Sequence, residues 1–334
     1  MWAVLLAAAL SCVPAAGAAG VTSREVSFQV RNTNTTALAC TSDGATYTVR
    51  GHITGPRSKK RAKPGVTLYL HGLGLGEWLW NFKPVKSYGH AREMARRGYT
   101  SVTVDRLGYG ASDKPLGTGS CIGSQADVAH QIVRALHSGS YAAGAGKARK
   151  YRRVVLVGHS AAGQISIVEA YTYRDVQALV IVGFSFSNLP RGNETFGYQR
   201  IDCQAGGSPV APGGPGGYAF FGRTPQEFRS TMFHSAPKAV QDAAVPLQNR
   251  DPCGDNLSLI AAIQRQTANV GKVRVPVLVV CGTNDVLYAP FGCEAQAERF
   301  SKGRTVILGN TGHGVPLERT GKTFRKRLGR FLDR

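Results

Sequence analysis

Acidic residues are scarce in this 334-residue chain: 20 aspartates and glutamates stand against 41 lysines and arginines, a formal net charge of +21. The excess gathers in the runs 57–63, 147–153 and 322–330. Such runs can attract nucleic acids, acidic polymers or anionic membranes. However, aromatic residues are not interleaved with them as a base-stacking surface requires, and no DNA- or RNA-reading motif is present. We therefore expect no specific nucleic-acid partner, and at most an electrostatic attraction to anionic surfaces.

The first 23 residues lack charged side chains altogether. Their apolar stretch is too short and too rich in alanine for a membrane span, but it suits the apolar region of a signal peptide. We predict a signal peptide over residues 1–18, cleaved after Ala16-Gly17-Ala18, and hence a secreted protein. A buried N-terminal helix is the alternative, and lipid attachment at Cys12 is disfavoured because the residues before it form a poor lipobox.

The cysteines show neither C-x-x-C nor zinc-ligand spacing, and we expect no metal site. Removal of the leader leaves an even number, namely Cys40, Cys121, Cys203, Cys253, Cys281 and Cys293. An even count in an exported chain suggests up to three disulfides. The pairs Cys203–Cys253 and Cys281–Cys293 are plausible, and free buried thiols are the alternative.

Short apolar runs alternate with helical stretches along most of the chain. The expected strands are 66–72, 99–105, 152–158, 178–183, 273–282 and 304–309. The expected helices are 82–97, 122–138, a helix from 161, 291–300 and 316–332. Continuous apolar strands separated by helices indicate a parallel sheet covered on both faces. We predict an α/β fold with a doubly wound, mostly parallel sheet of about eight strands.

Two regions depart from this alternation. Polar and apolar residues alternate over 24–31 and 46–53, which predicts antiparallel strands of an edge hairpin. Residues 184–272 are turn-rich with short helical pieces. We predict an inserted lid there, between a first part of the core (24–183) and a second part (273–334).

The stretch G-H-S-A-A, residues 158–162, lies between an expected strand and an expected helix. A serine hydroxyl becomes a nucleophile when a neighbouring base takes its proton and a tight turn holds the oxygen in the open. Small residues two before and two after the serine permit such a turn, and Gly158 and Ala162 meet this requirement. Ser160 is therefore the candidate nucleophile of a nucleophile elbow.

A developing oxyanion needs two preorganised donors. We expect the backbone N–H groups of Leu73, in the glycine-rich loop 70–78, and of Ala161 to supply them. That loop is not a nucleotide-binding loop, because it is not G-x-G-x-x-G and lacks the P-loop lysine.

The base is expected to be a histidine that a carboxylate orients, in the chain order Ser, Asp or Glu, His. His313 lies in a loop between the last expected strand and the closing helix, and Asp285 directly follows a strand. Weaker alternatives for the acid are Asp251, Asp255 and Glu318. Two other histidines, His71 and His159, belong to motifs, and the remaining five are expected mostly at the surface: His52, His90, His130, His137 and His234.

Together these motifs resemble those of an α/β-hydrolase fold serine hydrolase of the esterase or lipase kind with an inserted lid. The resemblance spans roughly 45–332 and rests on H-G-L-G (71–74), D-R-L-G-Y-G-A-S (105–112), G-H-S-A-A (158–162), G-T-N-D (282–285) and G-H (312–313). It implies a small-molecule or lipid ester substrate, an acyl-enzyme on Ser160 and no cofactor.

The expected acyl pocket uses aromatic residues of the lid, Phe184, Phe186, Tyr218, Phe220 and Phe221. These side chains could equally pack the lid itself. A haloperoxidase-like enzyme, a carbon–carbon hydrolase or a peptidase of the same fold also keeps serine at the elbow, and a non-catalytic binding protein on this fold is a further alternative.

Overall fold

The computed structural model describes residues 20–334, and the predicted signal peptide lies outside them. Its centre is an eight-stranded sheet in the order β1-β2-β4-β3-β5-β6-β9-β10. The strands are β1 (Val21–Arg31), β2 (Thr46–Pro56), β3 (Val66–Leu70), β4 (Ser101–Val104), β5 (Val154–His159), β6 (Ala178–Val182), β9 (Val277–Gly282) and β10 (Gly303–Leu308). Only β1–β2 and β2–β4 pair antiparallel in this sheet. The predicted class, strand number and edge hairpin are confirmed.

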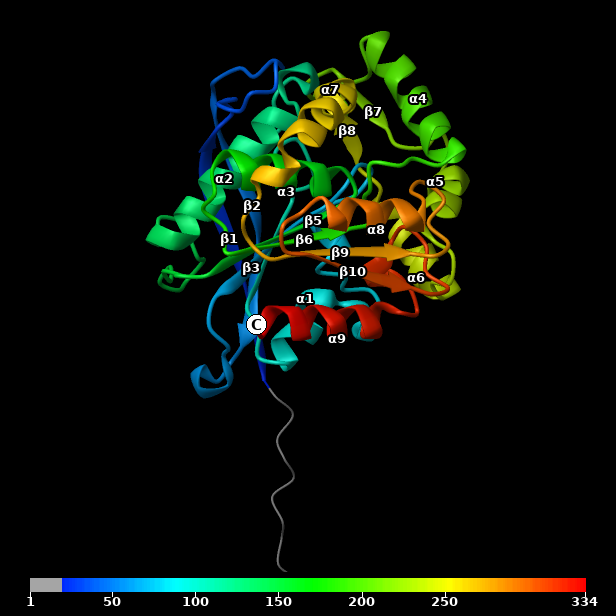
Figure 1. Ribbon diagram of the computed structural model, residues 1–334. Helices are drawn as coiled ribbons and strands as arrows, with labels where there is room; N and C mark the ends of the chain where they lie inside the picture. Colours follow the sequence, from blue (N-terminus) through cyan, green and yellow to red (C-terminus); the bar gives the residue numbers. More distant parts are fainter. Residues whose placement is uncertain (1–19) are drawn as a thin grey trace, which may run out of the picture.

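Helices cover both faces of the sheet (Figure 1). The core helices are α1 (His90–Arg96), α2 (Ile122–Ser138), α3 (Ala161–Thr172), α8 (Pro290–Glu298) and α9 (Gly321–Leu332). In Figure 1, α1 and α9 lie together below the sheet, and α2 and α3 lie together above it. The doubly wound arrangement follows from the sequence, because β5 and β6 are buried along their whole length and must be covered on both faces.

The helix predicted over 82–97 is wrong in its first half, since α1 begins only at His90. Pro84 disfavours helical backbone at the residue before it, and Gly89 is extended where it caps α1. The surface position expected for His90 is also wrong. Its ring is fully buried and packs against those of Tyr69, Trp80 and Phe324.

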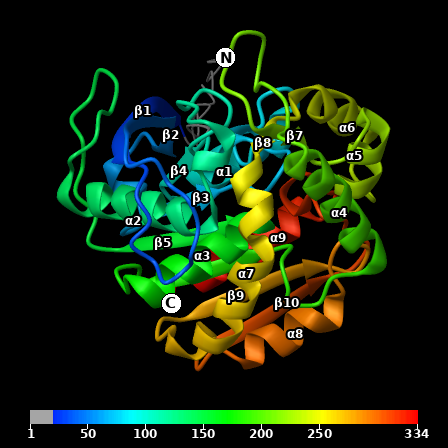
Figure 2. The ribbon, with the colours of Figure 1, turned by 90° about the horizontal axis from the view of Figure 1, so that it is seen from above.

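The segment 184–272 leaves the sheet after β6 and returns to it at β9, the neighbouring strand. It forms α4 (Pro190–Gln204), β7 (Tyr218–Phe220), α5 (Pro225–Met232), α6 (Lys238–Ala244), β8 (Arg250–Pro252) and α7 (Cys253–Asn269). Strands β7 and β8 make a separate two-stranded sheet. Figure 2 shows α4, α5 and α6 grouped on one side of the molecule, while α7 crosses in front of α3.

Three disulfides join distant parts of the chain, Cys40–Cys121, Cys203–Cys253 and Cys281–Cys293. The two pairs expected from the sequence are confirmed. The Cys203–Cys253 disulfide ties the end of α4 to the start of α7. Within residues 20–334, no helix combines the length and apolar character that crossing a membrane requires.

The three basic runs meet near the C-terminus of the chain. Lys63 pairs with Asp333 at 2.6 Å, and the Arg153 guanidinium donates to the carbonyl oxygen of Leu332 at 2.7 Å. The basic helix α9 ends at this point. The ends of the first two runs therefore lie beside the end of α9, the helix that carries the third run.

Candidate active site

Ser160 occupies the sharp turn between β5 and α3. Its backbone has φ 54° and ψ −127°, a positive φ that residues other than glycine rarely adopt. A side chain at Gly158 would collide with the carbonyl group of Ala162, and one at Gly72 would approach the Cβ of Ser160 to 2.6 Å. The small residues thus permit a tight turn, and they let the loop after β3 pass directly beside the serine.

His313 and Asp285 form a buried hydrogen-bonded pair. The Nδ1–H group of His313 donates to Oδ2 of Asp285 at 2.8 Å, and the two side chains are 0% and 1% exposed. The other oxygen of Asp285 accepts from the backbone N–H of Leu287 at 2.8 Å. With its proton held on Nδ1, the ring keeps a lone pair on Nε2. Within residues 20–334, this Nε2 has no hydrogen-bond partner.

The topology brings the three loops to one edge of the sheet. Ser160 follows β5, Asp285 follows β9 and His313 follows β10, and parallel strands end at the same edge. Strand β6 lies between β5 and β9 and is followed by Gly183, with φ 58°. A Cβ at Gly183 would lie 3.4 Å from Nδ1 of His313, so the loop after β6 lies directly against the histidine.

His159, next to the serine, contacts the histidine loop directly. Its Nε2 lies 2.9 Å from the carbonyl oxygen of His313, and the two ring centroids are 4.7 Å apart. Burial, with the nearby His313 adding to the effect, holds the pKa of His159 well below its usual value. A neutral His159 that donates from Nε2 therefore links the elbow to the loop of the candidate base, a contact the sequence analysis missed.

Tyr288 is a second residue that the sequence analysis missed. Its buried ring lies 5.8 Å from that of His313, and it stands three positions after Asp285. Burial raises the pKa of Tyr288, the charge of Asp285 adds to this, and a hydrogen bond with Ser160 opposes it. The phenol is therefore neutral and faces the serine.

The loop after β3 presents backbone donors beside Ser160. Within residues 20–334, neither the N–H of Leu73 nor that of Ala161, the first residue of α3, donates a hydrogen bond. By contrast, Gly74 N–H donates to Oδ1 of Asp251 at 2.6 Å. The start of α3 also directs the positive end of its dipole toward this space. The N–H groups of Leu73 and Ala161 are thus both available to a ligand.

Asp251, Asp255 and Glu318, the weaker candidates for the acid, bond to other groups. Asp251 accepts from Gln199 Nε2 at 2.6 Å, besides Gly74, and burial raises its pKa to about 7. Asp255 pairs with buried Arg106 at 2.8 Å. Glu318 accepts from the backbone of residues 234 and 235. Asp251 and Asp255 therefore anchor segment 184–272 to the loops around Ser160.

A cavity of about 160 Å³ lies against α3, and Ser160, Asp285 and His313 are not among its lining residues. Phe184 and Tyr288 belong to its wall. Phe184 also packs against Gly163 of α3, where a Cβ would lie 3.0 Å from that of Phe184. The other lining residues are Gln164, Asn188, Asn193, Phe196, Gly197, Arg200, Asn256, Leu259, Ile260 and Ile263. Its wall is mainly apolar and comes largely from α4 and α7. A larger hollow of 380 Å³ lies along β1 and β2, where none of the candidate catalytic residues line it.

Of the five aromatic residues expected in the pocket, Phe184 lines this cavity. Phe186 packs against Phe184 with ring centroids 6.0 Å apart, and Phe221 packs against Phe196 at 5.2 Å. Tyr218 and Phe220 line a different hollow on the far side of β7, and the Tyr218 hydroxyl donates to Pro115. The pocket thus draws on α4, a helix whose polar sequence gave no such indication, and on the apolar residues of α7.

Residues 68–326 match the alpha/beta hydrolase family. Among solved structures, the chain is similar to a thermophilic esterase from Thermogutta terrifontis, with 18% identity, a TM-score of 0.61 and coverage of 92% of this chain and 98% of the esterase. It is also similar to a bromoperoxidase from Bacillus anthracis, with 17% identity, a TM-score of 0.63 and coverage of 92% of this chain and 100% of the bromoperoxidase. An enol-lactonase from Burkholderia xenovorans is similar as well, with 16% identity, a TM-score of 0.62 and coverage of 86% of this chain and 97% of the lactonase. No curated protein matches it. The family match covers most of the chain, which therefore belongs to the alpha/beta hydrolase family.

Proposed function

We propose that this protein is a serine hydrolase that cleaves a carboxylic ester, or a related acyl bond, with Ser160, His313 and Asp285 as its catalytic triad. The observation that carries the proposal is the 2.8 Å hydrogen bond from His313 to Asp285, which leaves Nε2 of a buried imidazole without a partner. An unpaired buried polar atom costs about 1–3 kcal/mol. In a catalytic triad this nitrogen takes the proton of the serine hydroxyl, a role that a pure binding protein does not need.

In the acylation step, Oγ of Ser160 attacks the carbonyl carbon of the ester while Nε2 of His313 takes the hydroxyl proton. Asp285 keeps the other proton on Nδ1 and stabilises the imidazolium that forms. The tetrahedral intermediate then collapses, the bond to the alkoxide breaks, and His313 gives its proton to the departing alcohol. An acyl ester of Ser160 remains, with the imidazole neutral again.

In the second step, water replaces the serine as nucleophile. His313 takes a proton from the water as it attacks the acyl carbon, and returns that proton to Oγ of Ser160 as the acid is released. The backbone N–H groups of Leu73 and Ala161 stabilise the oxyanion in both steps. Loss of one such donor costs about 10² to 10³ in turnover in other serine hydrolases.

Segment 184–272 is proposed to act as the lid that holds the acyl group. The cavity that α4 and α7 line measures about 160 Å³, below the roughly 300–1,000 Å³ of common ligand pockets. Its size and its mainly apolar wall support a short acyl chain. Phe184 and Tyr288 would contact that chain next to the reacting carbon.

Two measurements test the proposal. A fluorophosphonate probe is expected to label Ser160, and p-nitrophenyl esters are expected to be hydrolysed with a preference for short acyl chains. Ser160→Ala should lose both labelling and about 10⁵ to 10⁶ of kcat. Activity that persists in Ser160→Ala would remove the mechanism, and an unlabelled serine in the folded wild type would favour the binding protein.

Substrate preference distinguishes an esterase from the other activities considered for this fold, namely a haloperoxidase-like enzyme, a carbon–carbon hydrolase and a peptidase. One of the similar structures is a bromoperoxidase and another an enol-lactonase, so proteins of this shape carry out different chemistry. A panel with esters, a lactone, a β-diketone and a proline peptide, at equal concentration, ranks them by kcat/KM. An ester that is not among the best substrates would count against the proposal.

We further propose that the protein is exported and attracted to anionic surfaces. Three disulfides support an oxidising compartment. The meeting of the three basic runs near the C-terminus supports the attraction. Retention on anionic lipid vesicles should fall steeply as salt rises from 50 to 300 mM, roughly as the screening length shortens.

A further inference from the structure

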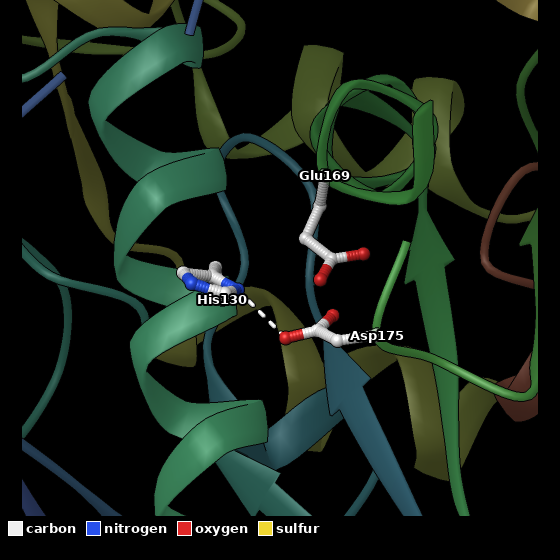
Figure 3. Close-up of side chains that lie close together, drawn as sticks. All are labelled: His130, Glu169 and Asp175. Atoms are coloured by element: carbon white, nitrogen blue, oxygen red, sulfur yellow. Dashed lines mark hydrogen bonds and ion pairs between the residues drawn. The ribbon is translucent and has the colours of Figure 1, made fainter. Parts of the chain in front are cut away.

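Three side chains of metal-ligand type meet at a site apart from the candidate active site (Figure 3). His130 comes from α2, Glu169 from α3, and Asp175 from the turn between α3 and β6. One ligand atom from each lies within 4.8 Å of those of the others. Glu169 stands nine residues after Ser160, about 13 Å along the helix at 1.5 Å per residue. The two sites therefore share α3 but use opposite ends of it.

Glu169 is the observation that points to a ligand. It is fully buried, and neither of its carboxylate oxygens has a hydrogen-bond partner within residues 20–334. Figure 3 shows its carboxylate directed at Asp175, whose Oδ1 is likewise buried and unpartnered. Oδ2 of Asp175 accepts from Nδ1 of His130 at 2.7 Å. Three buried oxygens thus face one space without a donor.

The charges around this space are unbalanced. Among the ion pairs of residues 20–334, the one that includes a member of the cluster joins His130 to Asp175, and no lysine or arginine pairs with Glu169. A buried carboxylate is stable where a cation or a proton compensates its charge.

We propose that His130, Glu169 and Asp175 bind one divalent transition-metal ion, with Zn²⁺ as the best-fitting ion. An imidazole nitrogen with two carboxylate oxygens is a ligand set for first-row transition metals, whereas Mg²⁺ and Ca²⁺ prefer oxygen ligands alone. Zinc bonds of about 2.0–2.2 Å place two ligand atoms about 3–4 Å apart, which small side-chain rotations reach from the present separations.

The surroundings suit an ion that enters from solvent and is held in place. The side chains of His130 and Asp175 are 19% and 22% exposed, which leaves room for water as a further ligand. The ring of Tyr173 stacks on His130 with centroids 3.9 Å apart and so restricts its rotation. His137 Nε2 lies 3.0 Å from the carbonyl oxygen of Asp175. The ion would join α2, α3 and the turn into β6, and so stabilise the core.

The test uses the protein without its predicted signal peptide, freed of bound metal with a chelator and then dialysed. After titration with Zn²⁺ and gel filtration, elemental analysis is expected to find one zinc per chain. The Tm should rise by about 5 °C when free Zn²⁺ reaches a hundredfold excess over Kd. Glu169→Gln, which keeps shape but removes the ligand charge, should weaken binding by about 100-fold or more. His234→Gln, which removes an exposed histidine elsewhere, is the matched control and should bind as the wild type does.

Circular dichroism first establishes that each variant is folded, and His130→Asn replaces Glu169→Gln if the latter is not. The absence of zinc uptake by the wild type would overturn the proposal in favour of a protonated Glu169 that shares its hydrogen with Asp175. Equal zinc binding by wild type and the ligand variant would overturn it too. So would an equal rise in Tm with Mg²⁺.

Discussion

The molecule contains two histidine–aspartate pairs of nearly equal geometry. His313 and Asp285 are joined at 2.8 Å, and His130 and Asp175 at 2.7 Å, in each case from Nδ1 to Oδ2. The first pair is 0% and 1% exposed, whereas the second is 19% and 22% exposed. The hydrogen bond alone therefore says little about function.

The neighbours of each pair make the difference. The loop of His313 contacts His159, the residue before Ser160 in its strained turn, so a proton accepted at Nε2 would serve the proposed reaction. Beside Asp175 lies a second carboxylate, that of buried Glu169, and neither of its oxygens has a hydrogen-bond partner in the described residues. We infer that one pair suits proton transfer and the other suits binding of a cation.

Removal of the carboxylate should separate the pairs most strongly. Asp285→Asn is expected to lower kcat by about 10⁴, because the amide favours the tautomer with the proton on Nε2, which blocks the base. The same change at Asp175 should lower ester hydrolysis by less than about twofold, since it alters no contact of Ser160 or His313. Kinetics of both purified variants check this. Similar losses in both would mean that the pairs are not functionally distinct.

Asp251 is a buried acid near the candidate active site that has no histidine partner. Its effect on the free energy of unfolding should therefore depend on pH. Burial raises the pKa of Asp251 to about 7, above the roughly 3.9 of an unfolded chain. Between these values the native state holds a proton that the unfolded state has lost, so this group makes stability fall as pH rises from about 4 to 7. Asp251→Asn cannot titrate and should gain relative to wild type over that range, by up to about 4 kcal/mol.

Unfolding in urea at pH 5 and pH 8 measures the gain. Relative to the wild type, Asp251→Asn is expected to have a higher free energy of unfolding at pH 8 than at pH 5. A difference that does not depend on pH would show that Asp251 is ionised at both values, held by the N–H of Gly74 and the amide of Gln199.

The core of the fold was predictable because its signals are local. Strands such as Val154–His159 are apolar throughout, and helix Ile122–Ser138 begins after Cys121 and ends before Gly139, whose φ of 77° suits glycine. The order of the motifs also identified Ser160, Asp285 and His313 as candidates, and the parallel topology carries their loops to one edge.

The remainder depends on contacts between distant residues. Helix α4 is polar with two glycines inside it, and its end is joined to the start of α7 by the Cys203–Cys253 disulfide. No local pattern announces such a helix or the cavity that it lines. The burial of His90 among three aromatic rings, and the meeting of His130 with Glu169, likewise arise from the packing of helices that are far apart in sequence.

A second histidine contacts each pair through a backbone carbonyl group. Replacing these histidines should change kcat less than replacing the carboxylates. The Nε2 atom of His159 lies 2.9 Å from the carbonyl oxygen of His313, and that of His137 lies 3.0 Å from the carbonyl oxygen of Asp175. His159→Gln should let the loop of the base shift and lower kcat by about tenfold, in line with the cost of losing one or two kcal/mol of alignment. KM should change little, because His159 does not line the cavity.

His137→Gln is the matched control and should leave kcat within about twofold, because its carbonyl partner belongs to the other pair. If both variants hydrolyse esters as the wild type does, the carbonyl contact does not position His313, and the Asp285 hydrogen bond is sufficient to hold the ring.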